Sequence, residues 1–327
     1  MPRVEYDGRS CDRREGESVL DALLRAGVAV PYSCKAGSCG SCLLRSRHGI
    51  QLPAVSQQGL KDAWKANGYF LSCVCVPEGD LDVVPVGAEM RTAVTVTSLD
   101  RLSDSVLRVR LTSESPFGHH PGQYLTLFRG DGLARSYSIA SLPADGALEL
   151  HVRLLPGGRM SQWLAHEATI GATLHIQGPS GDCFYVPDRQ DGPLLLAGTG
   201  TGLAPIYGIA REALSSGHRG PIILYHGAAT SSGLYLQEQL RALAAEHNNF
   251  TYTPTVLDID GPIDRAILAR HLTVAGWRAY LCGDPAVVQT LKKKLFLAGA
   301  ALNDIHADAF LPSAIPDSGP VAAAAVL

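Results

Sequence analysis

Three cysteines lie close together near the start of the chain, at Cys34, Cys39 and Cys42. In their C-x4-C-x2-C spacing, a single loop supplies three thiolates to a [2Fe–2S] cluster and a distant strand supplies the fourth. A structural zinc site usually draws cysteine pairs from two knuckles, and a disulfide framework belongs to a small secreted chain rather than to one of 327 residues. The spacing therefore predicts a cluster, and the intervening residues are small enough for the loop to turn its thiolates inward: Gly37, Ser38, Gly40 and Ser41.

The fourth thiolate has two candidates, Cys73 and Cys75, which are separated by a single residue in an apolar stretch. Side chains alternate between the two faces of a strand, so both cysteines would point to the same side. Periodicity alone therefore leaves the choice open.

A glycine-rich turn at residues 198–202 is the second feature with clear chemistry. It follows the apolar run 194–197 and precedes Leu203-Ala204-Pro205, an order that indicates strand, turn and helix. In such a unit a phosphate can approach the backbone closely and meet the positive end of the helix dipole. The pattern is G-x-G-x-G rather than the G-x-G-x-x-G fingerprint, and its residues are Gly198, Thr199, Gly200, Thr201 and Gly202.

Length and composition describe a protein of several domains. A chain of 327 residues predicts two or three of them, and 46% hydrophobic residues suffice for several cores. The net charge is -3 and no stretch is strongly basic, so nucleic acid is not expected as a partner. No run approaches about 20 apolar residues and the start has no apolar signal segment, so no membrane association is expected. Eight cysteines suit a reducing compartment, and the predicted location is the cytoplasm.

The first unit that would position these motifs is a small α+β domain of the ferredoxin-like (β-grasp) kind at residues 1–87. Turn residues and apolar periodicity predict a hairpin, a first helix ended by Gly27, a strand, a second helix and the strand carrying Cys73. The hairpin is expected at 2–12, the first helix at 17–24, the next strand at 43–44 and the second helix at 57–65.

Two further units follow. Residues 88–190 predict an antiparallel β-barrel with one helix near 160–166 and short strands at 92–97, 106–111, 123–128, 135–140, 148–154 and 173–177. Residues 191–313 predict an α/β doubly wound parallel sheet, because near-continuous apolar strands alternate with helices, at 194–197, 222–225, 250–256 and 279–282. The tail at 314–327 is expected to be disordered.

Two weak motifs in the predicted barrel gain meaning from their order. Arg135-Ser136-Tyr137-Ser138 is followed by Pro156-Gly157-Gly158-Arg159-Met160-Ser161 at a predicted helix start. Between a cluster loop and a parallel sheet, this order resembles the FAD domain of the ferredoxin–NADP reductase superfamily, with its R-x-Y-S/T strand and G-x-x-S helix start. The resemblance implies that Arg135 holds the pyrophosphate, that Tyr137 presents its ring to the isoalloxazine and that Ser138 lies near flavin N5.

The other FAD contacts that the resemblance implies are Ile139, His151, Arg153, Gly157, Gly158, Met160 and Ser161. The alternative for His151 and Arg153 is that they form salt bridges on the protein surface and do not contact the cofactor. Backbone amides at the predicted helix start would form an anion site.

Two motifs in the predicted parallel-sheet domain resemble the nicotinamide-nucleotide site of the same superfamily. The turn at 198–202 with its Leu-Ala-Pro continuation resembles the nucleotide loop, and Tyr280-Leu281-Cys282-Gly283-Asp284-Pro285 resembles a C-G-x-P loop. This implies that Cys282 lies beside nicotinamide C4, with a buried core thiol as the alternative, and that Gly283, Asp284 and Pro285 contact the cofactor. Phe310 would stack on the flavin until nicotinamide displaces it, or would be an ordinary core residue. The implied catalytic residues are Ser138, Cys282 and Phe310.

The choice between NADH and NADPH depends on the residues that follow the second parallel strand. Many relatives carry an arginine where Ala229 stands and an acid where Gly233 stands, and neither is present here. NADH is predicted because no base would pair an extra 2′-phosphate, and NADPH stays open.

From about Val19 to Pro312, the order of motifs resembles the reductase component of bacterial aromatic-ring-hydroxylating dioxygenases, especially the naphthalene dioxygenase type. In plant-type ferredoxins the last ligand precedes a proline by four positions, as Cys73 precedes Pro77, so the resemblance selects Cys73. It implies hydride transfer from NAD(P)H to FAD, and single electrons passed through the cluster to a Rieske ferredoxin or an oxygenase component.

Other functions share parts of this pattern. Reductases of di-iron monooxygenases and of deoxysugar dehydrases have the same architecture, and a redox sensor or electron carrier without turnover is the alternative from another class. A small basic group beside the cluster loop could steer an acidic acceptor, although a group of this size is usually only a solvated face: Lys35, Arg45, Arg47 and His48.

Overall fold

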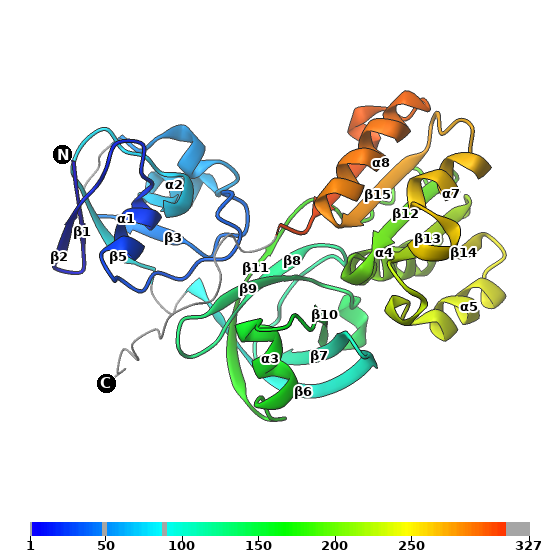
Figure 1. The fold of residues 1–327 in the computed structure, drawn as a ribbon, viewed down its shortest axis with the longest axis horizontal. Coiled ribbons are helices and arrows are strands. Elements are labelled where there is room, and N and C mark those ends of the chain that lie inside the picture. The colour runs from blue at the N-terminus through cyan, green and yellow to red at the C-terminus, as the bar shows by residue number, and fades with distance from the viewer. Residues whose placement is uncertain (1, 48–50, 87–89, 312–327) are drawn as a thin grey trace.

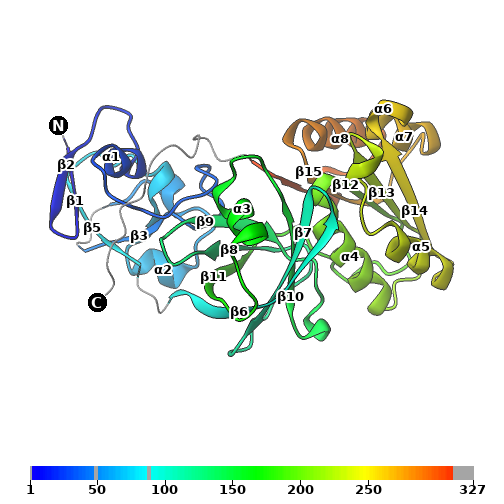
Figure 2. The same ribbon diagram turned by 60° about the horizontal axis from the view of Figure 1, so that its bottom comes forward.

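The computed structural model describes residues 2–47, 51–86 and 90–311. They form three domains: an N-terminal domain (β1 to β5), a barrel domain (β6 to β11) and a C-terminal domain (β12 to β16). The N-terminal and C-terminal domains lie at opposite ends of the barrel domain in both views (Figures 1 and 2). The first predicted domain joint at 87–88, His48 and the predicted tail at 314–327 lie outside the described residues.

The N-terminal domain is a mixed sheet in the order β2-β1-β5-β3-β4 with helix α1 packed on it. Helix α1 begins where Ser18 Oγ accepts the amide of Asp21 at 3.1 Å, an N-cap bond that satisfies one of the free donors of the first turn. Its buried face includes Leu20 and Leu23. The elements are β1 (Arg3–Tyr6), β2 (Arg9–Asp12), α1 (Val19–Arg25), β3 (Leu43–Ser46), β4 (Tyr69–Leu71) and β5 (Leu81–Pro85).

Two expectations for this domain were wrong. The helix predicted at 57–65 is a 3-10 turn η1 (Ala54–Gln57) and a separate short helix α2 (Asp62–Ala66). Gly59 between them has φ 76°, a left-handed conformation that a continuous helix does not contain. The segment carrying Cys73 is not a strand either, because it forms the 3-10 turn η2 (Ser72–Val74) after β4.

The barrel domain is an antiparallel sheet in the order β10-β7-β6-β11-β8-β9. The bridge between Ile139 and Leu150 joins the end of β9 to β10 and closes the barrel. Alternate side chains fill its interior, including Val96, Leu111 and Leu125. The elements are β6 (Thr92–Ser103), β7 (Val106–Ser113), β8 (Tyr124–Phe128), β9 (Ala134–Ser138), η4 (Pro143–Asp145), β10 (Leu148–Arg153), α3 (Arg159–His166) and β11 (Thr173–Ser180).

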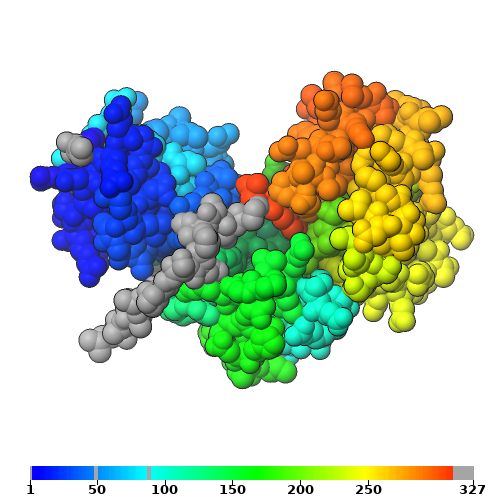
Figure 3. Space-filling view, in the orientation of Figure 1, coloured from blue at the N-terminus to red at the C-terminus, as the bar shows by residue number. Residues whose placement is uncertain are grey.

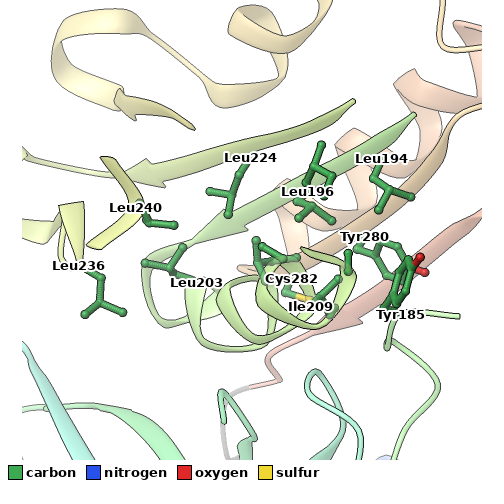
Figure 4. Close-up of a cluster of buried hydrophobic side chains, with 14 of the residues drawn as sticks. Tyr185, Leu194, Leu196, Leu203, Ile209, Leu224, Leu236, Leu240, Tyr280 and Cys282 are labelled. Atoms are coloured by element: carbon green, nitrogen blue, oxygen red, sulfur yellow. The ribbon is translucent and has the colours of Figure 1, made fainter. Parts of the chain in front are cut away.

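The C-terminal domain is a five-stranded parallel sheet in the order β14-β13-β12-β15-β16. Helices α4 and α5 cover one face and α7 and α8 the other, so strand residues on both faces are buried. Leu196, Leu224 and Cys282 belong to the core on the α4 side (Figure 4).

The strands of this domain are β12 (Leu194–Thr199), β13 (Ile222–Ala228), β14 (Phe250–Val256), β15 (Arg278–Gly283) and β16 (Ile305–Ala309). Its helices are η5 (Gly200–Gly202), α4 (Leu203–Ser215), η6 (Ser231–Gly233), α5 (Gln237–Glu246), α6 (Leu257–Asp260), α7 (Ile263–Arg270), α8 (Pro285–Leu297) and η7 (Leu302–Asp304). Over the described ranges, no helix is long and apolar enough to span a bilayer.

Candidate functional site

The cysteine loop between α1 and β3 wraps around its own sulfur atoms. Lys35, Gly37 and Gly40 have positive φ values of 53°, 74° and 72°, which turn the chain sharply at each step. A Cβ on Gly37 would lie 3.1 Å from a methyl group of Val74, so a larger residue would press on η2. The amide nitrogens of Ala36 and Cys39 lie 3.3 and 3.4 Å from Cys34 Sγ and donate hydrogen bonds to it.

The four predicted ligands form two contacting pairs, and Cys75 belongs to neither pair. Cys34 and Cys39 contact each other through their side chains, and so do Cys42 and Cys73, whose hydrogen bond lowers the pKa of Cys73. Cys75 is fully buried in the domain core, where burial raises its pKa to about 11. Two such pairs, with amide donors at Cys34 Sγ, supply the number of thiols that a [2Fe–2S] cluster needs.

The basic group beside the loop is largely engaged. Lys35 Nζ lies 2.6 Å from Asp21 Oδ1, and Arg47 Nε lies 3.7 Å from Asp82 Oδ1. Arg45 packs over the ring of Tyr69, with its guanidinium carbon 6.0 Å from the ring centroid. These contacts favour a solvated face for the described members of the group.

The predicted flavin strand is β9. Arg135 Nη1 donates to the carbonyl of Ala134 at 2.8 Å, and burial raises the pKa of Tyr137. Ser138 is 7% exposed, and its Oγ donates to Asp308 Oδ2 at 3.4 Å. The strand thus carries Ser138 to the edge of the C-terminal domain.

The glycine turn before α3 closes on itself. Gly157 has φ 71° and Gly158 is the N-cap residue of the helix. Ser161 Oγ accepts from the amide of Leu155 and donates to the carbonyl of Gly158, both at 3.3 Å. Met160 points into the barrel core, 1% exposed. Ser161 therefore shapes the turn that presents the first amides of α3.

His151 lies at the seam between the barrel and C-terminal domains. Its Nδ1 is 3.1 Å from the hydroxyl of Tyr235 and its Nε2 is 3.0 Å from Glu149 Oε1. Burial lowers its pKa. Of the neighbours predicted with it, Ile139 is fully buried at the barrel closure and Arg153 is exposed at the end of β10.

The two nucleotide motifs meet at the carboxyl edge of the parallel sheet. Gly198 on β12 pairs with Cys282 on β15, and Thr199 Oγ1 accepts the amide of Asp284 at 3.1 Å. A Cβ on Gly202 would overlap the carbonyl of Cys282, and one on Gly283 would overlap Thr199. Only glycines allow this close approach, so the two turns pack directly against each other at the sheet edge, where the first turn leads into α4, a place suited to a dinucleotide phosphate. Of the rest of the predicted set, Gly200 and Thr201 lie in η5 and Pro285 is the first residue of α8.

Cys282 and Phe310 end neighbouring strands. Cys282 is 1% exposed, burial raises its pKa, and its sulfur lies 3.6 Å from that of Cys183. The amide of Phe310 donates to the carbonyl of Gly283 at 2.8 Å, so the aromatic residue directly follows β16 beside β15.

A cavity of about 310 Å³ lies where the three domains meet. The space-filling view shows a hollow between the N-terminal domain, in blue, and α8, in orange, with the last described residues in red at its floor (Figure 3). The cavity lining combines the cluster loop, strand β8, the segment before β12 and strand β16, through Ser38, Tyr124, Asp182, Cys183, His306 and Asp308.

Asp308 is the residue that sequence reasoning missed. Burial and the nearby Asp182 raise its pKa to about 6, against the opposing hydrogen bond from Ser138. The sequence signal was its place two residues before Phe310, but its partner Ser138 lies 170 positions away in the chain.

The fold and the site together define a multidomain iron–sulfur flavoprotein oxidoreductase that uses NAD(P)H. Family models match the same three parts: residues 3–78 the 2Fe-2S iron-sulfur cluster binding domain, 93–185 the oxidoreductase FAD-binding domain and 196–293 the oxidoreductase NAD-binding domain.

Relatives cover the whole arrangement. The reductase component of the naphthalene 1,2-dioxygenase system of Pseudomonas putida is 36% identical over 328 residues, or 95% of this chain and 99% of the relative. The corresponding component of the naphthalene 1,2-dioxygenase/salicylate 5-hydroxylase systems of Ralstonia sp is 37% identical, over 92% of this chain and 95% of the relative. Among solved structures, a cytochrome P450 reductase of Amycolatopsis superposes with a TM-score of 0.68 and 31% sequence identity. The match covers 95% of this chain and 99% of that chain.

The chain belongs to the family of three-domain reductase components of oxygenase systems. It is an oxidoreductase with a [2Fe–2S] domain, an FAD domain and an NAD domain, and it transfers electrons from NAD(P)H.

Proposed function

We propose that this reductase takes a hydride from NADH and delivers single electrons to the Rieske ferredoxin or oxygenase component of an aromatic-ring-hydroxylating dioxygenase. The observation that carries the proposal is the shared cavity, which is lined by the cluster loop at Ser38 and by Asp308, the partner of Ser138 on the flavin strand. The proposed site of hydride transfer and the cluster loop, where electrons would leave, therefore line the same cavity.

Most of the predicted residues have a role in this proposal. The cluster is held by Cys34, Cys39, Cys42 and Cys73, and the flavin by β9 and the turn before α3. The nicotinamide nucleotide is held at residues 198–202 and 282–285. Ser138 and Asp308 hold a proton between Oγ and Oδ2 at the flavin edge, and Phe310 covers the ring until nicotinamide arrives.

The three groups supply complementary electron counts when bound, because nicotinamide delivers two electrons as a hydride, FAD accepts two and releases them singly, and the cluster takes one. A plant-type cluster lies near about −400 mV and a Rieske centre between about −150 and +300 mV, a drop of about 250 mV or more. At about 59 mV per tenfold, this drop favours the acceptor by at least about four decades. Electron transfer from the cluster to a Rieske acceptor is therefore strongly favoured over the reverse transfer.

The proposed preference for NADH follows from the loops at the ends of β13 and β14. The residues after β13, at 229–234, include no basic side chain. The amide of Asp258 donates to the carbonyl of Ala229 at 3.4 Å, which brings an acidic residue beside this loop. A carboxylate there disfavours a 2′-phosphate by like-charge repulsion. Comparing kcat/KM for NADH and NADPH tests this, and a preference for NADPH would contradict it.

A second acceptor class has support of its own. The reductase subunit of an Amycolatopsis aromatic O-demethylase is 33% identical over 95% of this chain, and the phenol hydroxylase P5 protein of Acinetobacter pittii is 30% identical over 95%. A monooxygenase component is therefore the alternative acceptor.

The test is NADH-driven reduction of four purified acceptors: a Rieske ferredoxin, a Rieske oxygenase, a di-iron hydroxylase and a cytochrome P450. We expect the highest kcat/KM with a Rieske protein. Faster reduction of a monooxygenase component would support the alternative, and no reduction of any acceptor would support a sensor without turnover.

A further inference from the structure

The barrel domain contacts the backbone of the cluster loop with three side chains. They come from β8 and β11, and each donates a hydrogen bond to one of three successive carbonyls of the loop. The hydroxyl of Tyr124 donates to Ser38 O at 2.7 Å, Thr126 Oγ1 to Cys39 O at 2.9 Å and Gln177 Nε2 to Gly40 O at 3.4 Å.

Thr126 differs from the other two because its hydroxyl also contacts the flavin strand. Thr126 is only 1% exposed, and its Oγ1 lies 3.1 Å from Ser136 Oγ on β9. A hydroxyl has one proton to donate. Since the Thr126 proton goes to the carbonyl of Cys39, Ser136 is the donor in the second bond.

Ser136 lies between Arg135 and Tyr137, two residues that the proposed function assigns to the flavin. Its Cα is the cross-strand partner of Thr126 in the pairing of β8 with β9. A chain of two hydrogen bonds therefore runs from the flavin strand through Ser136 and Thr126 to the carbonyl of Cys39. From that carbonyl the sulfur of Cys39 is reached through covalent bonds of the same residue.

We propose that Thr126, with Ser136 as its donor, is the positioning residue that holds the cluster loop at a fixed separation from the flavin strand and so sets the rate of electron transfer from flavin to cluster. The proposal rests on the proposed function, because it takes Cys39 as a ligand and β9 as the flavin strand. Electron tunnelling falls steeply with separation, and the buried hydroxyl of Thr126, which donates to Cys39 and accepts from Ser136, has little freedom to rearrange. The step itself moves one electron and breaks no bond in the protein.

The experiment follows two reactions of the holoprotein, with full iron and FAD content, after anaerobic mixing with NADH. Flavin bleaching reports hydride transfer, and the cluster signal in electron paramagnetic resonance of rapidly frozen samples reports the next step. Thr126→Val keeps the side-chain volume and removes the hydroxyl. We expect it to slow cluster reduction about fivefold, the population shift expected from the loss of one hydrogen bond, while flavin bleaching stays within twofold of the wild type.

Conservative and neighbouring variants separate positioning from a general loss of structure. Thr126→Ser should restore the wild-type rate, and Ser136→Ala should slow cluster reduction as Thr126→Val does. Gln177→Leu is the matched control, because it removes a hydrogen bond to the same loop without touching β9, and it should leave the rate within twofold.

Equal slowing in the Thr126→Val, Ser136→Ala and Gln177→Leu proteins would overturn the proposal in favour of simple domain docking, and unchanged cluster reduction in Thr126→Val would overturn it outright. Failure of the wild-type cluster to accept electrons from NADH would instead reject the proposed function.

Discussion

Replacing Asp308 with asparagine should stabilise the protein and impair its chemistry. The carboxyl group lies beside Ser138 and near Asp182, and its pKa is raised from an ordinary 3.8 to about 6, first by burial. A raised carboxyl pKa means that the unfolded chain releases this proton at lower pH than the folded protein. The folded state therefore loses stability as the pH rises from about 4 to about 6, and the loss persists above that range.

The size of this effect follows from the pKa difference. At about 1.36 kcal/mol per pKa unit, the ionised group costs about 3 kcal/mol at pH 7.5 and about 1 kcal/mol at pH 4.5. Asparagine keeps the shape and cannot ionise, so Asp308→Asn should raise the free energy of unfolding by up to these amounts. In the folded wild type, the carboxylate fraction should rise from about one tenth at pH 5 to about nine tenths at pH 7.

The assay combines thermal unfolding with the pH profile of flavin reduction by NADH. We expect the stability gain of Asp308→Asn to shrink between pH 7.5 and 4.5, and the wild-type inflection near pH 6 to disappear. Asp182→Asn is the matched variant: removing this neighbouring charge should move the inflection to lower pH. A variant less stable than the wild type at pH 7.5, or one that keeps the inflection, would refute the reasoning.

Three further predictions concern single side chains. Cys75→Ser should keep the visible spectrum of the cluster and Cys73→Ser should lose it, as measured on purified protein; the reverse outcome would exchange their roles. His226→Leu should raise the free energy of unfolding by about 1–2 kcal/mol, because His226 is fully buried and neither ring nitrogen has a hydrogen-bond partner among the described residues. Burial lowers the pKa of His226 to about 3, so the wild type loses stability as the pH falls below about 6.5 and the advantage of leucine should grow there; a constant advantage in urea unfolding would argue against this. Phe310→Ala should weaken nicotinamide discrimination, seen as a smaller ratio of NADH to NADPH kcat/KM, and an unchanged ratio would count against stacking.

The parts of the fold that the sequence predicted well are those with strong local patterns. Alternation and apolar runs located the strands of the barrel and of the parallel sheet, with β14 confirmed at both ends. The second helix of the N-terminal domain was misjudged, because one glycine with a positive φ, Gly59, interrupts an otherwise helical composition. The alternation argument for Cys73 and Cys75 failed for a related reason, since η2 rotates the chain between them.

The site was predictable to the extent that each motif is continuous in the chain. The thiols of the loop and the two turns at the sheet edge are local, so their residue types and spacing were sufficient to predict them as candidates. Asp308 and Thr126 act through partners on other strands, Ser138 and Ser136, and strand pairing across the chain decides which side chains meet. For His151, a strand position could not distinguish a cofactor contact from the contact with Tyr235 at the domain seam.

The most direct measurement is an anaerobic titration of the holoprotein with NADH, followed by visible absorption and electron paramagnetic resonance. Because the flavin accepts two electrons and the cluster one, full reduction consumes about 1.5 equivalents of NADH, and the signal of a reduced [2Fe–2S] cluster should appear and grow as NADH is added in excess. Complete flavin bleaching after about one equivalent, with the cluster still oxidised in the presence of excess NADH, would contradict the claim that this protein exports electrons through its cluster.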